Sequence, residues 1–148
     1  MFDIEAVDHI GIRVADLDRA AAFYGHFGFT ALHRAPNDAV LVIKNRHDVE
    51  INLIYNANHD AGGKNILMDV AEKYPGYTHV AFRVLSIAAT IGMLREHKIA
   101  ITQGPVAFGQ DGNVSLFVRD PDRNVIELRG RAEDLSALGG VEAYKPEN

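Results

Sequence analysis

The chain has 148 residues, of which 47% are hydrophobic and 24% are charged, and its formal net charge is −5. These values are typical of a water-soluble globular domain with a sizeable core, and the negative charge argues against nucleic acid as a partner. No apolar run is long enough to span a bilayer and no leader is evident at the amino terminus, so we expect a cytoplasmic protein without a membrane partner. The absence of cysteine excludes disulfides and thiolate metal ligands.

An internal repeat begins near the amino terminus. With a shift of 70, VDHIGIRVADLDRA (7–20) aligns with YTHVAFRVLSIAAT (77–90), and His9 falls on His79. Alternating apolar residues over 77–84 predict a β-strand with His79 in its interior. The alignment therefore predicts two equivalent first strands, each with a histidine.

A helix follows each of these strands. Asp16 and Ser86 occupy the same place in the repeat, and both residue types cap helix amino termini. Short strands are expected after the helices, at 29–34 and 99–103. The apolar stripes predicted for the helices consist of Leu17, Ala20, Ala21, Tyr24 and Phe27 in the first and Ile87, Ile91 and Leu94 in the second.

The two halves also end alike. With a shift of 75, VLVIKNRHDVEINLIYN (40–56) aligns with SLFVRDPDRNVIELRGR (115–131). Both segments predict two strands around a polar turn, and residues 120–124 of the second are rich in turn formers. Each half therefore predicts the order strand, helix, strand, strand, strand.

We expect one domain spanning residues 1–148. The first module covers about 5–56, and a linker over about 57–76 contains one helical turn in the segment NILMDVAEKY. The second module covers about 77–130. A polar tail over 131–148 is expected to follow the surface.

Equivalent modules usually pack about a pseudo-twofold axis, which would give His9 and His79 equivalent positions. Two imidazoles that face one another across such an axis would share a proton or bind a metal. The last strand adds Glu127, whose carboxylate is costly to bury unless it is paired or bound to a cation. Two histidines and one carboxylate suit a divalent transition metal and leave positions open for substrate.

The sequence resembles the vicinal oxygen chelate superfamily, which includes glyoxalase I, fosfomycin- and bleomycin-resistance proteins, methylmalonyl-CoA epimerase and extradiol dioxygenases. The resemblance covers about residues 5–130 and rests on DHIGIRVADLDRAAAFYGHFGF, GYTHVAFRV and FVRDPDRNVIELRG. It implies an α+β fold, in which two βαβββ modules form a cupped mixed sheet around one divalent metal, namely Ni, Zn, Fe, Mn or Co. His9, His79 and Glu127 match three of the ligand positions.

The fourth ligand position falls in the last strand of the first module. A gap-free overlay puts Asn52 opposite Glu127, and INLIYN is similar to the glyoxalase pattern IELTYN. Glu50 lies on the same face, about 6.5–7 Å away along the strand. Because a carboxylate is the better ligand, we favour Glu50 as the ligand and expect Asn52 to line the substrate cavity. If neither residue binds, the metal has three protein ligands and more water.

Other positions distinguish among the chemistries of the superfamily. Arg13 and Asn56 match residues that hold glutathione in glyoxalase I, whereas Ala107 replaces a lysine that often follows the GPV segment. Phe117 stands where extradiol dioxygenases carry a tyrosine, and Gly11 stands where fosfomycin transferases usually carry a threonine. The resemblance to glyoxalase I is therefore greater than the resemblance to these two branches.

The resemblance implies a metal-dependent lyase or isomerase of the glyoxalase I type that acts on a small oxygen-rich substrate, such as a thiol hemithioacetal. The metal would polarise two neighbouring oxygens, and Glu127 with Glu50 would transfer the proton. The alternatives are a fosfomycin- or bleomycin-type resistance protein that modifies or sequesters a small molecule, an epimerase, and a ring-cleaving dioxygenase. Relatives with two modules usually form homodimers, so we expect a homodimer.

Overall fold

The structure is a computed structural model that describes residues 2–59, 63–108, 112–131, 138 and 142–143. The chain forms two compact units, Met1–Lys64 and Asn65–Asn148. The boundary between them falls inside the predicted linker. None of the helices in the described ranges is long and apolar enough to cross a membrane.

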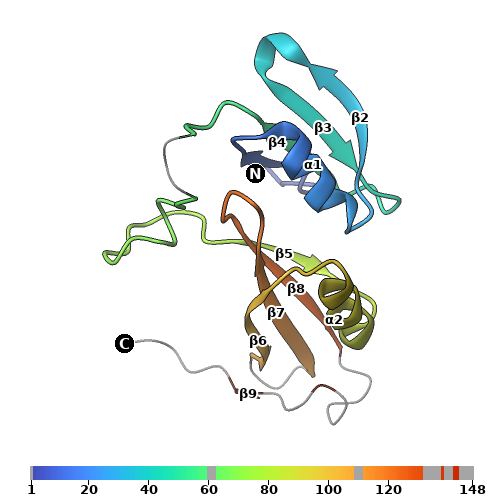
Figure 1. Cartoon of the computed structure of the whole chain (residues 1–148). Coiled ribbons are helices and arrows are strands. Elements are labelled where there is room, and N and C mark those ends of the chain that lie inside the picture. The colour runs from blue at the N-terminus through green and yellow to red at the C-terminus, as the bar shows by residue number, and fades with distance from the viewer. Residues whose placement is uncertain (1, 60–62, 109–111, 132–137, 139–141, 144–148) are drawn as a thin grey trace. The chain divides into compact units, whose positions relative to one another are not determined.

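The first unit contains one helix and a four-stranded sheet (Figure 1). Its elements are β1 (Ile10–Arg13), α1 (Leu17–Gly25), β2 (Thr30–Ala35), a 3-10 turn (Pro36–Asp38), β3 (Val40–Lys44) and β4 (Glu50–Ile54). The strand order is β1-β4-β3-β2, with β1 parallel to β4 and the other neighbours antiparallel.

The second unit repeats this order. Its elements are β5 (Val80–Arg83), α2 (Ile87–Glu96), β6 (Ile101–Ala107), β7 (Asn113–Arg119), β8 (Val125–Arg131) and β9 (Glu142–Ala143). The sheet has the order β5-β8-β7-β6-β9, and β5 is parallel to β8. The predicted α+β fold of two βαβββ modules is therefore confirmed. Most of the predicted tail lies outside the described residues, but its short strand β9 pairs with β6.

Both helices begin where the repeat predicts. The side chain of Asp16 accepts a hydrogen bond from the backbone N–H of Arg19 at 2.9 Å, and that of Ser86 accepts one from Ala89 at 3.1 Å. Each cap satisfies an N–H that has no partner within its helix. The buried helix residues are Ala20, Phe23 and Tyr24 in α1, and Ile87, Thr90, Ile91 and Leu94 in α2.

The sheet of the second unit has two chemically different faces. Leu116 and Leu128 form one register pair and are fully buried. Because side chains alternate along a strand, the opposite face carries Ser115, Phe117 and Glu127. The apolar face suits the buried stripe of α2, which contacts β8 (Figure 1). The mixed face carries the polar residues of the candidate site.

The strand registers confirm the overlay of the two halves. Gly11 pairs with Asn52 across β1 and β4, and Ala81 pairs with Glu127 across β5 and β8. Asn52 therefore occupies the position in its sheet that Glu127 occupies in the other. Glu50 lies two residues earlier, at the start of β4.

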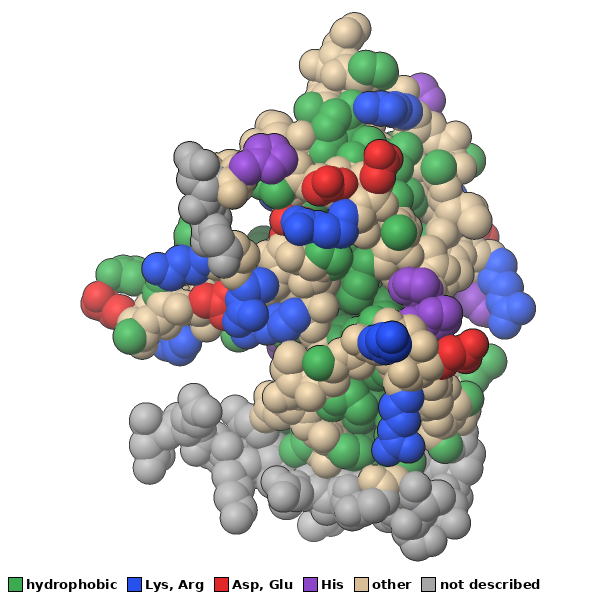
Figure 2. Space-filling model, in the orientation of Figure 1, with side chains coloured by type: hydrophobic (Ala, Val, Ile, Leu, Met, Phe, Trp, Pro, Cys, Tyr) green, Lys and Arg blue, Asp and Glu red, His purple; other side chains and the backbone are tan. Residues whose placement is uncertain are grey.

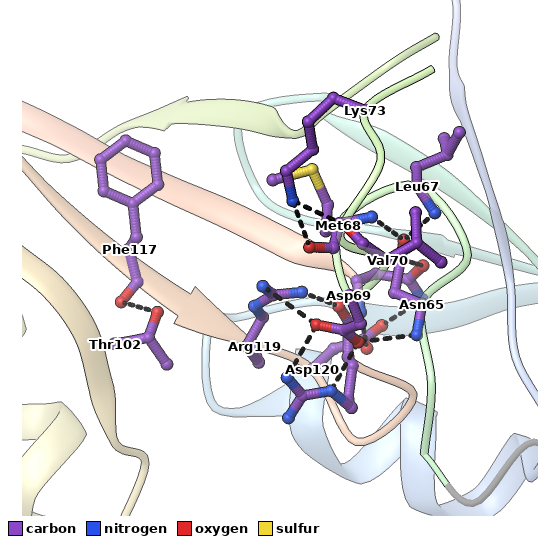
Figure 3. Close-up of polar contacts among 12 residues, drawn as sticks. Asn65, Leu67, Met68, Asp69, Val70, Lys73, Thr102, Phe117, Arg119 and Asp120 are labelled. Atoms are coloured by element: carbon purple, nitrogen blue, oxygen red, sulfur yellow. Dashed lines mark hydrogen bonds and ion pairs between the residues drawn. The ribbon is translucent and has the colours of Figure 1, made fainter. Parts of the chain in front are cut away.

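In the linker, the segment predicted to hold one helical turn contains turns and bends over residues 66–72. The backbone N–H of Asp69 donates to the carbonyl of Asn65 at 2.8 Å, which closes one turn. Figure 3 shows the Asp69 carboxylate beside the end of β7, where Arg123 donates two hydrogen bonds to it at 2.7 and 2.8 Å. Arg119 Nη2 lies 3.5 Å from the same carboxylate. The hydrogen bond from Arg123 holds the pKa of the Asp69 carboxyl well below its usual range.

Candidate functional site

His79 and Glu127 form the centre of the candidate site. Nε2 of His79 lies 2.9 Å from Oε2 of Glu127. Nδ1 of His79 lies 2.8 Å from the Thr78 hydroxyl, so both ring nitrogens have polar neighbours. The edge of the ring also contacts Phe117, with centroids 5.6 Å apart and an interplanar angle of 82°.

The prediction that His79 lies inside a strand is wrong by one residue. The parallel ladder between β5 and β8 begins at the pair Val80–Ile126, and β5 begins at Val80, so His79 lies immediately before the strand. His9 likewise precedes β1. Histidine side chains are visible on the surface in Figure 2, and the side chain of His79 is 35% exposed. A ligand from solvent can therefore reach its imidazole.

Glu127 is buried, with only 7% of the residue exposed. Ser115 donates a hydrogen bond to Oε1 of Glu127 at 2.5 Å, and Arg129 donates one to the Ser115 hydroxyl at 3.0 Å. A buried carboxylate needs such partners, because its desolvation is otherwise unfavourable. The second oxygen, Oε2, is the one near His79.

The predicted metal ligands of the first unit have other neighbours. Nδ1 of His9 lies 2.6 Å from Asp8, and the Glu50 carboxylate lies 3.6 Å from Nζ of Lys44. Oδ1 of Asn52 is buried and has no hydrogen-bond partner among the described residues. This amide oxygen can therefore accept a hydrogen bond from a ligand or bind a cation.

The predicted substrate-binding residues Arg13 and Asn56 do meet. Nε of Arg13 donates to Oδ1 of Asn56 at 3.1 Å, and both residues are exposed. The structure thus brings together two predicted pairs, one in each unit. Within the described ranges, no group of three or more histidine, aspartate and glutamate side chains is close enough to hold a metal ion.

The chemistry of the donors in the second unit fits a divalent metal. Nitrogen and oxygen ligands about 2.1 Å from a metal lie about 3 Å from each other at the octahedral angle of about 90°, and about 3.4 Å apart at the tetrahedral angle that zinc prefers. The separation of 2.9 Å between His79 Nε2 and Glu127 Oε2 is that of a hydrogen-bonded pair, and it is also compatible with the octahedral spacing. Imidazole and carboxylate are also ligands that first-row transition metals accept. His79 and Glu127 can therefore serve as neighbouring ligands.

The motifs in the sequence did not indicate Ser115 as part of the candidate site, where it contacts Glu127. In the antiparallel register, Ser115 pairs with Arg129 and Phe117 pairs with Glu127, so all four lie on one face. The predicted turn at residues 120–124 could have indicated this register, because Ser115 and Arg129 lie equally far from its centre. The side-chain contacts themselves depend on packing, which the sequence pattern does not specify.

The chain belongs to the Glyoxalase/Bleomycin resistance protein/Dioxygenase superfamily, whose family model matches residues 6–128. It is 31% identical over 128 residues to the glyoxalase domain-containing protein RDO1 of Mycosarcoma maydis, covering 84% of this chain and 68% of that protein. Membership confirms the resemblance seen in the motifs.

Solved structures confirm the fold. A glyoxalase/dioxygenase from Nostoc punctiforme is 22% identical, with a TM-score of 0.66 over 87% of this chain and 92% of that one. The fosfomycin resistance protein FosX from Listeria monocytogenes is 16% identical, with a TM-score of 0.64 over 85% of this chain and 91% of that one. The two similarities show a shared fold across relatives with different described roles.

Proposed function

We propose that the protein is a divalent-metal-dependent lyase or isomerase of the glyoxalase I type. Its substrate would be small and oxygen-rich, and a thiol hemithioacetal has the required chemistry. The observation that carries this proposal is the contact between His79 Nε2 and Glu127 Oε2 at the spacing of neighbouring metal ligands. The superfamily membership of the chain supports it independently.

The proposed ligands are His9, His79 and Glu127, with either Glu50 or Asn52 as the fourth. Asn52 is supported by its register position and by its buried oxygen, which has no hydrogen-bond partner in the part of the chain that the structure describes. Glu50 is supported by its charge, since carboxylates bind divalent metals more strongly than amides. A bound divalent metal would act as a Lewis acid toward two neighbouring substrate oxygens.

The remaining residues would bind substrate and move protons. Glu127, together with Glu50, is the proposed acid and base because carboxylates can accept and return a proton next to the substrate carbon. Arg13, held by Asn56, would present its guanidinium to a carboxylate of a thiol cofactor such as glutathione. We further propose that the protein acts as a homodimer, as relatives with two modules often do.

A second candidate function is resistance to a small toxic molecule, by modification or by sequestration. The family description itself includes bleomycin resistance proteins, and the FosX structure shares the fold. In the sequestering form of this function, a drug-like ligand would bind without a metal and without turnover. An epimerase or a ring-cleaving dioxygenase would use the same metal with another substrate.

Turnover of the hemithioacetal of methylglyoxal and glutathione, measured on metal-loaded protein, tests the enzyme proposal. Glu127→Gln should lower kcat more than it raises KM, because it removes a charged ligand and the proposed base. Glu96→Gln, on the exposed end of α2, is the matched control and should retain activity. If the metal-loaded parent turns over no hemithioacetal, epoxide or catechol, the enzyme proposal is wrong and the sequestering function takes its place.

The same assay tests whether a glutathione adduct is used. Arg13→Ala should raise KM for the glutathione adduct, because it removes a charged contact with the thiol cofactor. Arg83 is the repeat equivalent of Arg13 and is also exposed, so Arg83→Ala is the matched control. Unchanged kinetics in Arg13→Ala would remove glutathione from the proposal and leave the metal site untouched.

A further inference from the structure

A serine links the buried carboxylate to an arginine in the second unit. The Ser115 hydroxyl donates to Oε1 of Glu127 and accepts from Nη1 of Arg129. The direct distance from Arg129 Nη1 to Glu127 Oε1 is 3.8 Å, which is too long for a hydrogen bond. Ser115 is fully buried, and its single O–H donor is used by the carboxylate. The hydroxyl therefore connects the two charged groups.

This link assigns different environments to the two oxygens of Glu127. Oε1 accepts the hydrogen bond from Ser115, whereas Oε2 lies 2.9 Å from His79. The register of β7 and β8, in which Ser115 pairs with Arg129, places Ser115, Glu127 and Arg129 next to one another. Rotation of the carboxylate would break the hydrogen bond to Ser115, so the hydroxyl holds the orientation in which one carboxylate oxygen faces His79.

The first unit has no such link at the equivalent positions. The overlay with a shift of 75 places Val40 at the position of Ser115 and Ile54 at that of Arg129, and these two residues also pair in register. Neither side chain can donate a hydrogen bond. At the position of Glu127 stands Asn52, whose Oδ1 has no partner in the described part of the chain. The link is therefore not a general consequence of the fold, and it accompanies the carboxylate.

We infer that Ser115 and Arg129 are positioning residues for the metal ligand Glu127. They hold Oε1, so that Glu127 offers Oε2 alone and binds as a monodentate ligand beside His79. The inference rests on the proposed function, because it requires a metal at this pair. The inference also limits the movement of the Glu127 side chain, because a carboxylate with a partner at each oxygen cannot rotate without breaking a contact.

Binding of Co²⁺ to the metal-free full-length chain tests this inference without substrate. Ser115→Ala should weaken Co²⁺ binding by about tenfold or more, measured by competition with a chelator, as loss of a partner behind a ligand typically does. The visible absorption of the Co²⁺ bound to Ser115→Ala should also weaken. Without the serine hydroxyl, the Glu127 carboxylate can bind Co²⁺ through both oxygens and raise the coordination number of the ion. Ser115→Thr keeps the hydroxyl and should restore both values.

Thr102→Val is the matched control. The Thr102 hydroxyl donates its hydrogen bond to the backbone carbonyl of Phe117 in the same sheet and not to Glu127, so parent-like Co²⁺ affinity is expected. Arg129→Met tests the other end of the link at a partly exposed side chain, should Ser115→Ala fail to fold. It should weaken Co²⁺ binding by a smaller factor than Ser115→Ala, since the serine hydroxyl remains.

Two outcomes overturn the inference and can be told apart. If the parent binds Co²⁺ and both Ser115→Ala and Arg129→Met match its affinity and spectrum, the positioning role is wrong although the metal site stands. If the parent itself binds no Co²⁺, the proposed function fails and the inference fails with it.

Discussion

Asn52 and Glu127 occupy equivalent positions but differ in what surrounds them. Glu127 has hydrogen-bond and ion-pair partners for both oxygens, whereas the buried Oδ1 of Asn52 has none among the described residues. An unpaired buried carbonyl oxygen costs about 1–3 kcal/mol, so Asn52 would gain from a cation or a substrate donor. The overlay of the halves could predict the equivalence. It could not predict the missing partner, because that depends on packing around the side chain.

Substitution of Glu50 and of Asn52 distinguishes the two candidates for the fourth ligand. Substitution of the residue that is a ligand should weaken metal binding at least tenfold, which corresponds to about 1.4 kcal/mol of binding free energy. The other should affect mainly the KM for substrate. The variants are Glu50→Gln and Asn52→Ala, and metal affinity is measured by chelator competition. Parent-like affinity in both variants would mean that the metal has three protein ligands.

At the scale of elements, local patterns determined most of what could be predicted. The caps Asp16 and Ser86 and the hairpin repeats follow short-range rules, and the structure confirms them. Contacts between residues distant in sequence could not be predicted in this way. Asp69 and Arg123 are 54 positions apart, and nothing in either local pattern pairs them. The same limit applies to the start of β5, because β5 pairs with β8, a strand distant from it in the sequence.

The Asp69–Arg123 pair should stabilise the second unit in a pH-dependent manner. Asp69→Asn should lower the free energy of unfolding at pH 7 by about 1–3 kcal/mol, because charged hydrogen bonds are lost. The pKa of Asp69 is lower in the folded chain than in the unfolded chain, so its contribution is complete above about pH 4 and declines as the pH falls further.

Chemical denaturation of the parent and of Asp69→Asn between pH 7 and pH 2 measures this effect. The difference between their free energies of unfolding should shrink toward the acid end of the range. Asp38→Asn, on the exposed 3-10 turn, is the control and should track the parent. A difference that stays constant with pH would show that the charge of Asp69 does not stabilise the fold.

At the scale of the whole molecule, duplication is the organising feature. Both units have the same strand order, and their first and last strands pair in parallel with equivalent registers. Each unit has a histidine immediately before its first strand, His9 before β1 and His79 before β5. The two copies have since diverged, because only the second carries a carboxylate linked to serine and arginine. The proposed divalent metal depends on His79 and Glu127, which contact each other in the second unit.

The proposed metal site is tested most directly by the metal content of His79→Ala. The variant and the parent are loaded with Co²⁺, Ni²⁺ or Zn²⁺, excess metal is removed, and the retained metal is measured in both. The parent should retain about one metal per chain, and the variant should lose most of it because an imidazole ligand is gone. The variant should remain folded, since His79 lies at the surface and outside the apolar core. His33→Ala, on the exposed strand β2, is the control and should bind metal as the parent does. Stoichiometric metal in folded His79→Ala would show that His79 is not a ligand. A parent that retains no metal would show that the proposed metal site is wrong.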